Sequence, residues 1–347
     1  MINYNEEYWK DVETAAAHVL DREKLFGSSI LITGATGMIC SSVTELLFYM
    51  NKKYHAGIRI RLAGRSRERM QARFYDFRDD RDYEFMQYDA TSDNCMKTSA
   101  DYLIHGASNA NPAVYTREPV ETMLANILGL NHLLKMAVET KSRRLLYISS
   151  SEVYGNKEGE RPYREDDFGY LDILNQRASY PSAKRAAETL CIAYGQEYGL
   201  DTVIVRPGHI YGPAITDTDS RASAQFTRNA VNGEDIIMKS TGTQLRSYCY
   251  TLDCASAILS VLMKGEQGTA YNISNRDSIA SVSDIAEAFA GISGRKVVYE
   301  QPTDTEKKGY NLMLNSSLDS SRLEKLGWSA AFSLEQGTRK TIAALKE

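Results

Sequence analysis

Short apolar runs alternate with longer amphipathic stretches between residues 29 and 207. The runs are rich in Ile, Leu and Tyr and predict buried strands. They lie at residues 30–32, 58–64, 83–88, 102–105 and 144–148. The stretches between them carry apolar residues at helical spacing, for example from 119 to about 140. The alternation predicts an α/β fold with a doubly wound parallel sheet, in which ligands bind beyond the C-terminal ends of the strands.

Two further regions flank this predicted sheet. Residues 6–25 carry one apolar stripe and predict a helix on the outside of the fold, to which we assign no chemistry. We divide the chain into an N-terminal helical extension (1–27), a sheet domain (28–208) and a smaller C-terminal α/β domain (209–347), from which some segments return to the sheet domain. Polar segments at 214–222 and 301–311 are predicted to be substrate loops.

A glycine turn follows the first predicted strand. Gly34 and Gly37 lie between the apolar run and the next predicted helix. Backbone N–H groups at a helix N-terminus point outward and, together with the helix dipole, favour a phosphate. Gly34 lets the chain turn, and Gly37 lets the backbone approach a pyrophosphate. The turn predicts a dinucleotide site, and an ordinary βα turn with two glycines is the alternative.

The end of the second predicted strand bears on which dinucleotide binds. An acidic residue there would accept the ribose hydroxyls of NAD, whereas arginine suits the 2′-phosphate of NADP. The strand ends at Ala63 and Gly64, and Arg65 follows. Because arginine holds phosphate through two parallel hydrogen bonds, the sequence favours NADP over NAD. The alternative is a solvated basic helix start, since Arg69 and Arg73 continue the run.

The next two strand ends also suit a cofactor. Asp89 ends the third predicted strand and is placed to hold the adenine amine. Ala107 and Ser108 follow the fourth, where small residues let the backbone lie against a cofactor. His105, which ends that strand, is predicted to be a structural histidine rather than a catalyst.

Candidate catalytic residues follow the fifth predicted strand. Ser150 lies directly after it, and Tyr180 and Lys184 lie four residues apart at the start of a predicted helix. That spacing puts the tyrosine and lysine on one helical face. We expect the cation to lower the tyrosine pKa from about 10 toward neutrality. Tyr180 could then take a proton from a hydroxyl while Ser150 holds the same oxygen. The alternative is an exposed Tyr/Lys pair.

Composition narrows the function classes. The apolar content of 43% and charged content of 25% are typical of a soluble globular protein. A net charge of −4 argues against a nucleic-acid-binding protein. The five cysteines have no C-x-x-C spacing, so we predict reduced thiols and no metal site. Without a signal-peptide pattern or an apolar run of membrane length, we expect a cytoplasmic protein that does not enter a membrane.

Several motifs together resemble the extended short-chain dehydrogenase/reductase family, and within it the NAD-dependent epimerase/dehydratase branch that acts on nucleotide sugars. The resemblance runs from about Ser29 to Leu345. Its motifs are Thr33–Ile39, His105–Ala107, the Pro119/Asn126/Gly129 helix, Ser151–Gly155, Tyr180/Lys184, Arg206–Pro207 with Tyr211–Pro213, Tyr250–Asp253, Tyr271–Ser274 and Leu326–Trp328.

This resemblance implies a Rossmann-type dinucleotide domain, a nucleotide-sugar-binding second domain and a homodimer. It also implies the roles of individual residues. The implied catalytic residues are Ser150, Tyr180, Lys184 and Glu152. The implied NAD- or NADP-binding residues are Gly34, Thr36, Gly37, Met38, Ile39, Arg65, Asp89, Ala90, Ala107, Ser108, Asn126, Tyr180, Lys184, Pro207, Gly208 and Ile210. The implied residues for a nucleotide-diphosphate sugar are Asn109, Ser151, Glu152, Arg177, His209 and Arg246.

The reaction itself stays open between three readings. Family dehydratases carry Thr-Asp-Glu where this chain has Ser150–Glu152, and UDP-glucuronate decarboxylases carry the more similar Thr-Ser-Glu. The first reading is therefore a redox-neutral decarboxylase or epimerase that oxidises the sugar at C4. Departures from the family pattern at Cys40, His209 and Arg65 count against a simple transfer of its function. The NADP preference indicated by Arg65 supports the second reading, an NADPH-dependent reductase of a nucleotide-linked keto sugar. The third is a non-catalytic NAD(P)-binding sensor.

Overall fold

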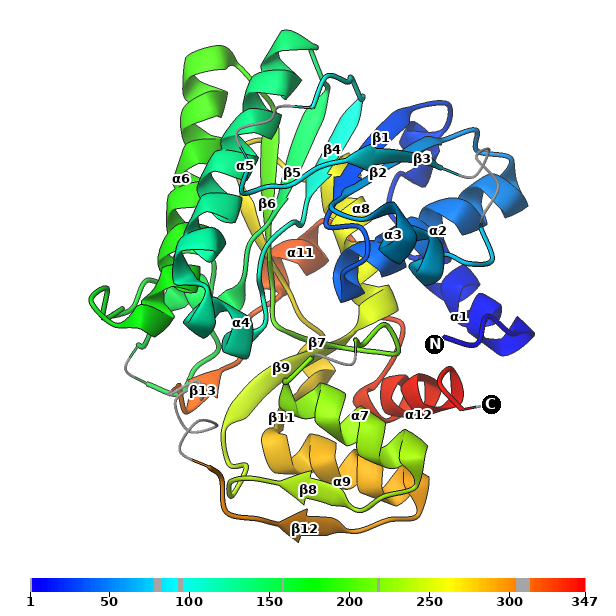
Figure 1. Cartoon of the computed structure of the whole chain (residues 1–347), viewed down its shortest axis with the longest axis vertical. Helices are drawn as coiled ribbons and strands as arrows, with labels where there is room; N and C mark the ends of the chain where they lie inside the picture. The colour runs from blue at the N-terminus through cyan, green and yellow to red at the C-terminus, as the bar shows by residue number, and fades with distance from the viewer. Residues whose placement is uncertain are drawn as a thin grey trace.

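The computed structural model describes residues 2–77, 83–92, 96–157, 159–216, 219–303 and 313–346. Within them, seven parallel strands form the main sheet, in the order β10-β6-β5-β4-β1-β2-β3 (Figure 1). The strands are β1 (Ser29–Thr33), β2 (Arg59–Gly64), β3 (Glu84–Gln87), β4 (Tyr102–His105), β5 (Arg144–Ile148), β6 (Thr202–Pro207) and β10 (Ala270–Ile273). The order reverses between β1 and β4, so a ligand-binding crevice is expected at their C-terminal ends. The predicted doubly wound fold is confirmed.

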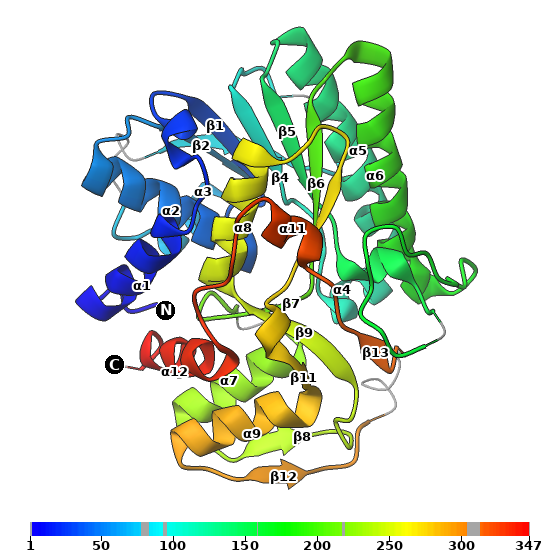
Figure 2. The same ribbon diagram turned by 180° about the vertical axis from the view of Figure 1, so that it is seen from behind.

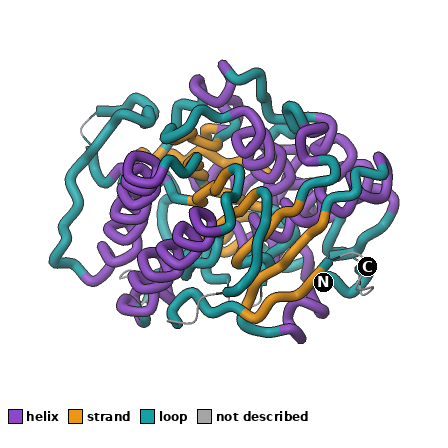
Figure 3. The backbone as a smooth tube through the Cα atoms, turned by 90° about the horizontal axis from the view of Figure 1, so that it is seen from above, coloured by secondary structure: helices purple, strands orange, loops and turns teal. Residues whose placement is uncertain are grey.

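Alternate residues of each strand face opposite layers of helices. Ile30 and Ile32 of β1 join an apolar cluster that includes α1, α2 and α8, whereas Leu31 joins a cluster with α5 and α6. The helices thus cover both faces of the strands (Figure 3). Their bounds are α1 (Glu6–Ala17), α2 (Met38–Tyr54), α3 (Arg67–Arg73), α4 (Pro112–Arg117), α5 (Pro119–Glu139), α6 (Ser179–Tyr198) and α8 (Thr251–Lys264). Burial on both faces explains why the strands read as continuous apolar runs.

A smaller unit follows the main sheet. Strand β9 (Leu245–Tyr250) pairs with β7 (His209–Tyr211), β11 (Ile279–Ser281) and β13 (Asn315–Ser316). Its remaining elements are α7 (Ala222–Asn232), β8 (Ile236–Met238), α9 (Val282–Ser293), β12 (Val297–Tyr299) and α12 (Leu334–Ala343), whereas α11 (Ser321–Lys325) packs on β10 of the main sheet. Figure 2 shows this unit from behind, below the main sheet. Strand β10 leaves it and pairs with β6 in the main sheet.

The N-terminal extension is a shorter helix than predicted. Helix α1 ends at Ala17, and a 3-10 turn (Arg22–Leu25) follows. Asp21, between them, adopts a left-handed backbone conformation with φ of 49°, which a continuous helix cannot contain. The prediction of one helix over 6–25 was therefore wrong in its second half.

Candidate active site

The turn after β1 brings backbone segments unusually close together. Gly34 has φ of +70°, and a Cβ there would lie 2.7 Å from the backbone of Gly106 at the end of β4. Helix α2 then begins at Met38, with Gly37 as its N-cap. No side chain caps this helix and no acidic residue lies in its first turn. Its first N–H groups are thus left for an anion, which fits the pyrophosphate of a dinucleotide.

Cys40 stands where the related motif has its third glycine. Its Sγ occupies the space that a Cβ on Gly106 would need, so the cysteine and the glycine fit each other. Burial raises the pKa of the Cys40 thiol to about 12. Cys40 is therefore a packing residue, and the departure from the glycine pattern leaves the turn intact. Thr36 and Ile39, in the same turn, are half-buried.

The segment after β2 lies where the adenosine of a dinucleotide is expected. Arg65 is exposed, and its carbonyl accepts a hydrogen bond of 2.8 Å from Gln87 Nε2. The Asp89 carboxylate accepts bonds from the backbone N–H and hydroxyl of Thr91, at 3.0 and 2.8 Å. Its pKa is lowered by these bonds and by Arg65. Ala90 is buried against Gly129 of α5, so in this structure it packs on a helix.

A polar network orders the end of β4. Asn126 Nδ2 donates to Ser108 Oγ at 2.9 Å, and Tyr147 donates its hydroxyl to Asn126 Oδ1 at 3.0 Å. Ala107, beside Ser108, is half-buried beyond the C-terminal end of β4. His105 is buried and lies 2.7 Å from the hydroxyl of Thr33, which fits the predicted structural role.

Helix α6 carries Tyr180 and Lys184 in its first turns, after β5. Lys184 is buried and donates from Nζ to the Ile148 carbonyl at 2.6 Å. Its Nζ lies 5.7 Å from the centre of the Tyr180 ring and 4.7 Å from that of Tyr147. Burial lowers the Lys184 pKa to about 7, against the opposing effect of Glu188. The amino group of Lys184 is thus fixed beside the tyrosine by its hydrogen bond to the last residue of β5.

The predicted lowering of the Tyr180 pKa was wrong. Burial raises that pKa, and the Glu152 carboxylate raises it further. The hydrogen bond with Ser150 and the charge of Arg221 lower the Tyr180 pKa, but by less than burial raises it. Sequence spacing indicates the neighbouring cation but not the burial of the phenol, which penalises its charged form.

Glu152 is held between an arginine and a tyrosine. Arg177 Nη2 lies 3.0 Å from Glu152 Oε1, and the Tyr115 hydroxyl donates to the same oxygen at 3.4 Å. The Tyr115 ring stacks on Tyr180, with centres 5.0 Å apart and planes inclined by 10°. Glu152 Oε2 is buried without a hydrogen-bond partner among the described residues. Arg177, predicted to bind substrate, is therefore engaged with Glu152 here, and one carboxylate oxygen remains available.

Two more basic residues face the site from the smaller unit. Arg246, on β9, is buried, and in the described part of the chain its hydrogen bond goes to the Leu245 carbonyl at 2.8 Å. Burial lowers the pKa of His209, on β7, to about 3, and Arg246 and Arg221 lower it further. His209 Nδ1 has no partner among the described residues. The buried guanidinium of Arg246 suits an anionic ligand, and the neutral His209 ring can donate or accept one further hydrogen bond at Nδ1.

The remaining predicted residues lie around this centre. Ser151 is buried in the 3-10 turn that contains Glu152, and Asn109 Nδ2 is 3.4 Å from Thr122 Oγ1. Pro207, Gly208 and Ile210 form the link from β6 to β7, where a Cβ on Gly208 would lie 2.8 Å from the Ser247 carbonyl. Of the predicted substrate loops, residues 217–218 and 304–311 lie outside the described residues.

Sequence reasoning missed Tyr115 and Arg221. Tyr115 lies on α4, and Arg221 pairs with Asp219 at 2.6 Å before α7. No local spacing links either residue to Tyr180, so no sequence signal was available. Among the described residues, no group of three His, Cys, Asp or Glu could hold a metal ion. The described helices also include none with the length and apolar character needed to cross a membrane.

Comparison with known proteins identifies relatives of this site. The model of the NAD dependent epimerase/dehydratase family matches residues 30–274. UDP-glucuronic acid decarboxylase 6 of Arabidopsis thaliana is 29% identical over 324 residues, covering 92% of this chain and 89% of the relative. UDP-glucuronic acid decarboxylase 1 of Xenopus tropicalis is 28% identical, over 90% of this chain and 71% of that protein.

Solved structures share the fold. UDP-glucose 4-epimerase from Thermotoga maritima, with UDP-glucose, has a TM-score of 0.76 and 23% identity, covering 91% of this chain and 98% of that one. UDP-glucuronic acid 4-epimerase from Bacillus cereus, with UDP-glucuronic acid and NAD, has a TM-score of 0.74 and 21% identity over the same shares. At these identities the structures establish the common fold.

Proposed function

Because the chain belongs to the NAD-dependent epimerase/dehydratase family, we propose that it is a redox-neutral enzyme that oxidises a UDP-linked uronic acid at C4 and then decarboxylates or epimerises it. The observation that carries this proposal is the Glu152–Arg177 pair beside Ser150 and Tyr180, at the C-terminal end of β5. Ser151 stands where a dehydratase would carry an acid, so loss of water has no evident proton donor. The decarboxylase relatives support the same choice.

The residues at the crevice fit a nicotinamide dinucleotide, through the uncapped start of α2 and the close contact of Gly34 with β4. When bound, such a cofactor accepts a hydride from the sugar and later returns it. The residues that would hold it include Gly37, Met38 and Ser108.

Tyr180 exchanges a proton with the C4 hydroxyl of the sugar, and Ser150 binds the same oxygen. Lys184 Nζ lies 5.7 Å from the centre of the phenol ring, and in its protonated form it stabilises the ionised phenol.

Oxidation at C4 turns a uronate into a β-keto acid. The bond between C5 and the carboxyl carbon can then break, with its electron pair moving into the ketone as carbon dioxide leaves. A proton returns to C5, and Tyr180 returns its proton to the C4 oxygen as that carbon is reduced again. Glu152 Oε2, which has no partner among the described residues, is free to orient the sugar or to exchange a proton with it. Arg246 and His209 bind the diphosphate.

Incubation of the purified protein with UDP-glucuronate tests this proposal. We expect a UDP-pentose with carbon dioxide, or the C4 epimer, and no accumulation of reduced dinucleotide. Absence of both products would count against a uronate substrate. In a parallel incubation with a nucleotide-linked keto sugar and NADPH, consumption of one NADPH per sugar molecule would instead support the reductase.

The reductase stays a second candidate because of the end of β2. That strand ends at Gly64 without an acidic residue, and the exposed Arg65 follows. This arrangement supports NADP, which suits net reduction. We expect Arg65→Ala to weaken NADPH binding about tenfold and NADH binding little, because only NADPH carries the 2′-phosphate. Titration of each dinucleotide measures the effect, and Arg339→Ala, at an exposed arginine on α12, is the control. An equal loss of affinity for NADH and NADPH would mean that Arg65 does not bind the 2′-phosphate and is only a solvated surface residue.

The homodimer also stays a proposal. Helices α5 and α6 pack side by side, and α5 exposes Val120, Met123 and Leu124. An apolar strip on a surface helix supports contact with a second copy. Sedimentation equilibrium would reveal the mass of the dimer, and a monomer at high concentration would count against it.

A further inference from the structure

The N-terminal extension is tightly integrated, although the family model begins only at residue 30. Tyr8, Val12, Ala15 and Ala16 of α1 are buried in the same apolar cluster as α2 and α8. Tyr4, which precedes the helix, stacks on Trp9 with ring centres 5.7 Å apart. The extension therefore packs against the half of the fold that contains the glycine turn, and it also forms polar contacts there.

Those polar contacts converge on one buried carboxylate. Glu45, on α2, is completely buried and receives the hydroxyl of Tyr4 at 2.7 Å and that of Tyr8 at 2.6 Å. Arg73 Nη2 lies 2.6 Å from Glu45 Oε1 and 3.0 Å from Ser41 Oγ. Arg73 also donates to the Tyr4 hydroxyl. The two tyrosines thus complete the shell of a buried ion pair, which needs such bonds to offset its desolvation.

The ion pair fixes one end of α3. Arg73 is the last residue of this seven-residue helix. At the other end, Ser66 accepts the Arg69 N–H at 3.1 Å, and Arg67 lies over the Phe85 ring at 4.7 Å. Arg65 immediately precedes this cap. Because α3 has only seven residues, we expect a shift at Arg73 to move the arginines at the start of the helix as well.

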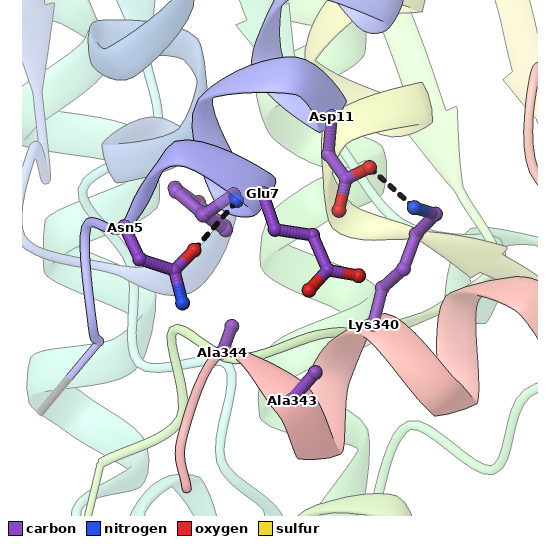
Figure 4. Close-up of a pocket in the computed structure, with 7 residues that line it drawn as sticks. Asn5, Glu7, Asp11, Lys340, Ala343 and Ala344 are labelled. Atoms are coloured by element: carbon purple, nitrogen blue, oxygen red, sulfur yellow. Dashed lines mark hydrogen bonds and ion pairs between the residues drawn. The ribbon is translucent and has the colours of Figure 1, made fainter. Parts of the chain in front are cut away.

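The opposite side of α1 contacts the C-terminal helix. Lys340 of α12 forms an ion pair with Asp11, across the small pocket shown in Figure 4. The Asn3 N–H donates to the Ala344 carbonyl at 2.8 Å. These contacts join the two ends of the chain and do not involve α3, so they offer a matched control.

We propose that the N-terminal extension is a positioning element for the dinucleotide: Tyr4 and Tyr8, acting through Glu45 and Arg73, hold α3 and the segment from Arg65 to Arg69 against the adenosine end of the cofactor. The inference rests on the proposed function in requiring a dinucleotide in the crevice, and it holds for NAD and NADP alike. The extension thereby gains a role in cofactor affinity, apart from the chemistry at Tyr180.

The test uses the full chain with Tyr4→Phe and Tyr8→Phe combined, which removes both hydroxyls and keeps both rings. We expect the Kd for NADH and NADPH to rise about fivefold or more, while the Kd for UDP stays within about twofold. UDP binding reports the folded substrate site, and fluorescence titration reports the dinucleotides. Asp11→Asn, which removes the ion pair on the other side of α1, is expected to leave all three values unchanged.

Arg73→Lys provides a second variant, because it keeps the charge at Glu45 but cannot reproduce the guanidinium bonds to Tyr4 and Ser41. It is expected to weaken dinucleotide binding selectively as well. Two results would overturn the inference and leave the extension with a structural role alone. One is a lower melting temperature with an unchanged Kd for the dinucleotides. The other is an equal loss of affinity for UDP and for the dinucleotides. A wild-type chain that binds UDP but neither dinucleotide would refute the proposed function itself.

Discussion

Tyr180→Phe is expected to lower turnover of the sugar nucleotide by about a thousandfold, with little change in dinucleotide affinity. The variant keeps the ring that stacks on Tyr115 at 5.0 Å but removes the hydroxyl that exchanges a proton with the substrate. Steady-state turnover and dinucleotide titration measure the two effects separately.

Tyr115→Phe is the matched control, since it removes a hydroxyl from the neighbouring parallel ring. That hydroxyl contacts Glu152 at 3.4 Å, so we expect a much smaller loss of turnover. Undiminished activity of Tyr180→Phe would remove the catalytic assignment. If the wild-type chain binds a dinucleotide and a nucleotide sugar but turns over neither UDP-glucuronate nor a keto sugar, the result would support a non-catalytic NAD(P)-binding sensor.

Glu152→Gln is expected to lower turnover by about a hundredfold, because the amide keeps the shape of the side chain but loses its ability to accept a proton. It also weakens the contact of Oε1 with Arg177, at 3.0 Å in the structure. Turnover and the Kd for UDP are to be measured together, because the proposed role predicts a loss of turnover rather than of nucleotide binding.

Glu121→Gln is the control for Glu152, since it makes the same change at an exposed carboxylate on α5. Its turnover is expected to equal that of the wild type. If both glutamine variants kept wild-type turnover, Glu152 would have no part in proton exchange or in sugar orientation.

Local sequence signals were sufficient for most of the fold. The apolar run before Gly34 and the Tyr180/Lys184 spacing each predict an element whose bounds the structure reproduces closely. Both faces of a parallel strand are buried, so its sequence is continuously apolar and easily recognised. Glycine turns and helix starts also depend on residues adjacent in sequence, which is why the strand–turn–helix unit could be predicted.

Features that depend on distant segments could not be predicted. Tyr115 reaches Tyr180 only because α4 folds against α6, and Glu45 meets Tyr4 across 41 residues. The raised pKa of Tyr180 depends on its burial, which the sequence spacing does not encode. Arg177 is predicted to bind substrate because its position matches a motif, and that motif does not show its ion pair with Glu152 in the folded chain.

The fate of the C4 hydrogen tests the central claim most directly. UDP-glucuronate with deuterium at C4 is incubated with the protein and an excess of unlabelled dinucleotide, and the sugar product is analysed by mass spectrometry. A redox-neutral enzyme takes the hydride from C4 and returns it, so the account predicts a UDP-pentose or epimer that keeps its deuterium. Product without the label, or deuterium in the free dinucleotide pool, would contradict it.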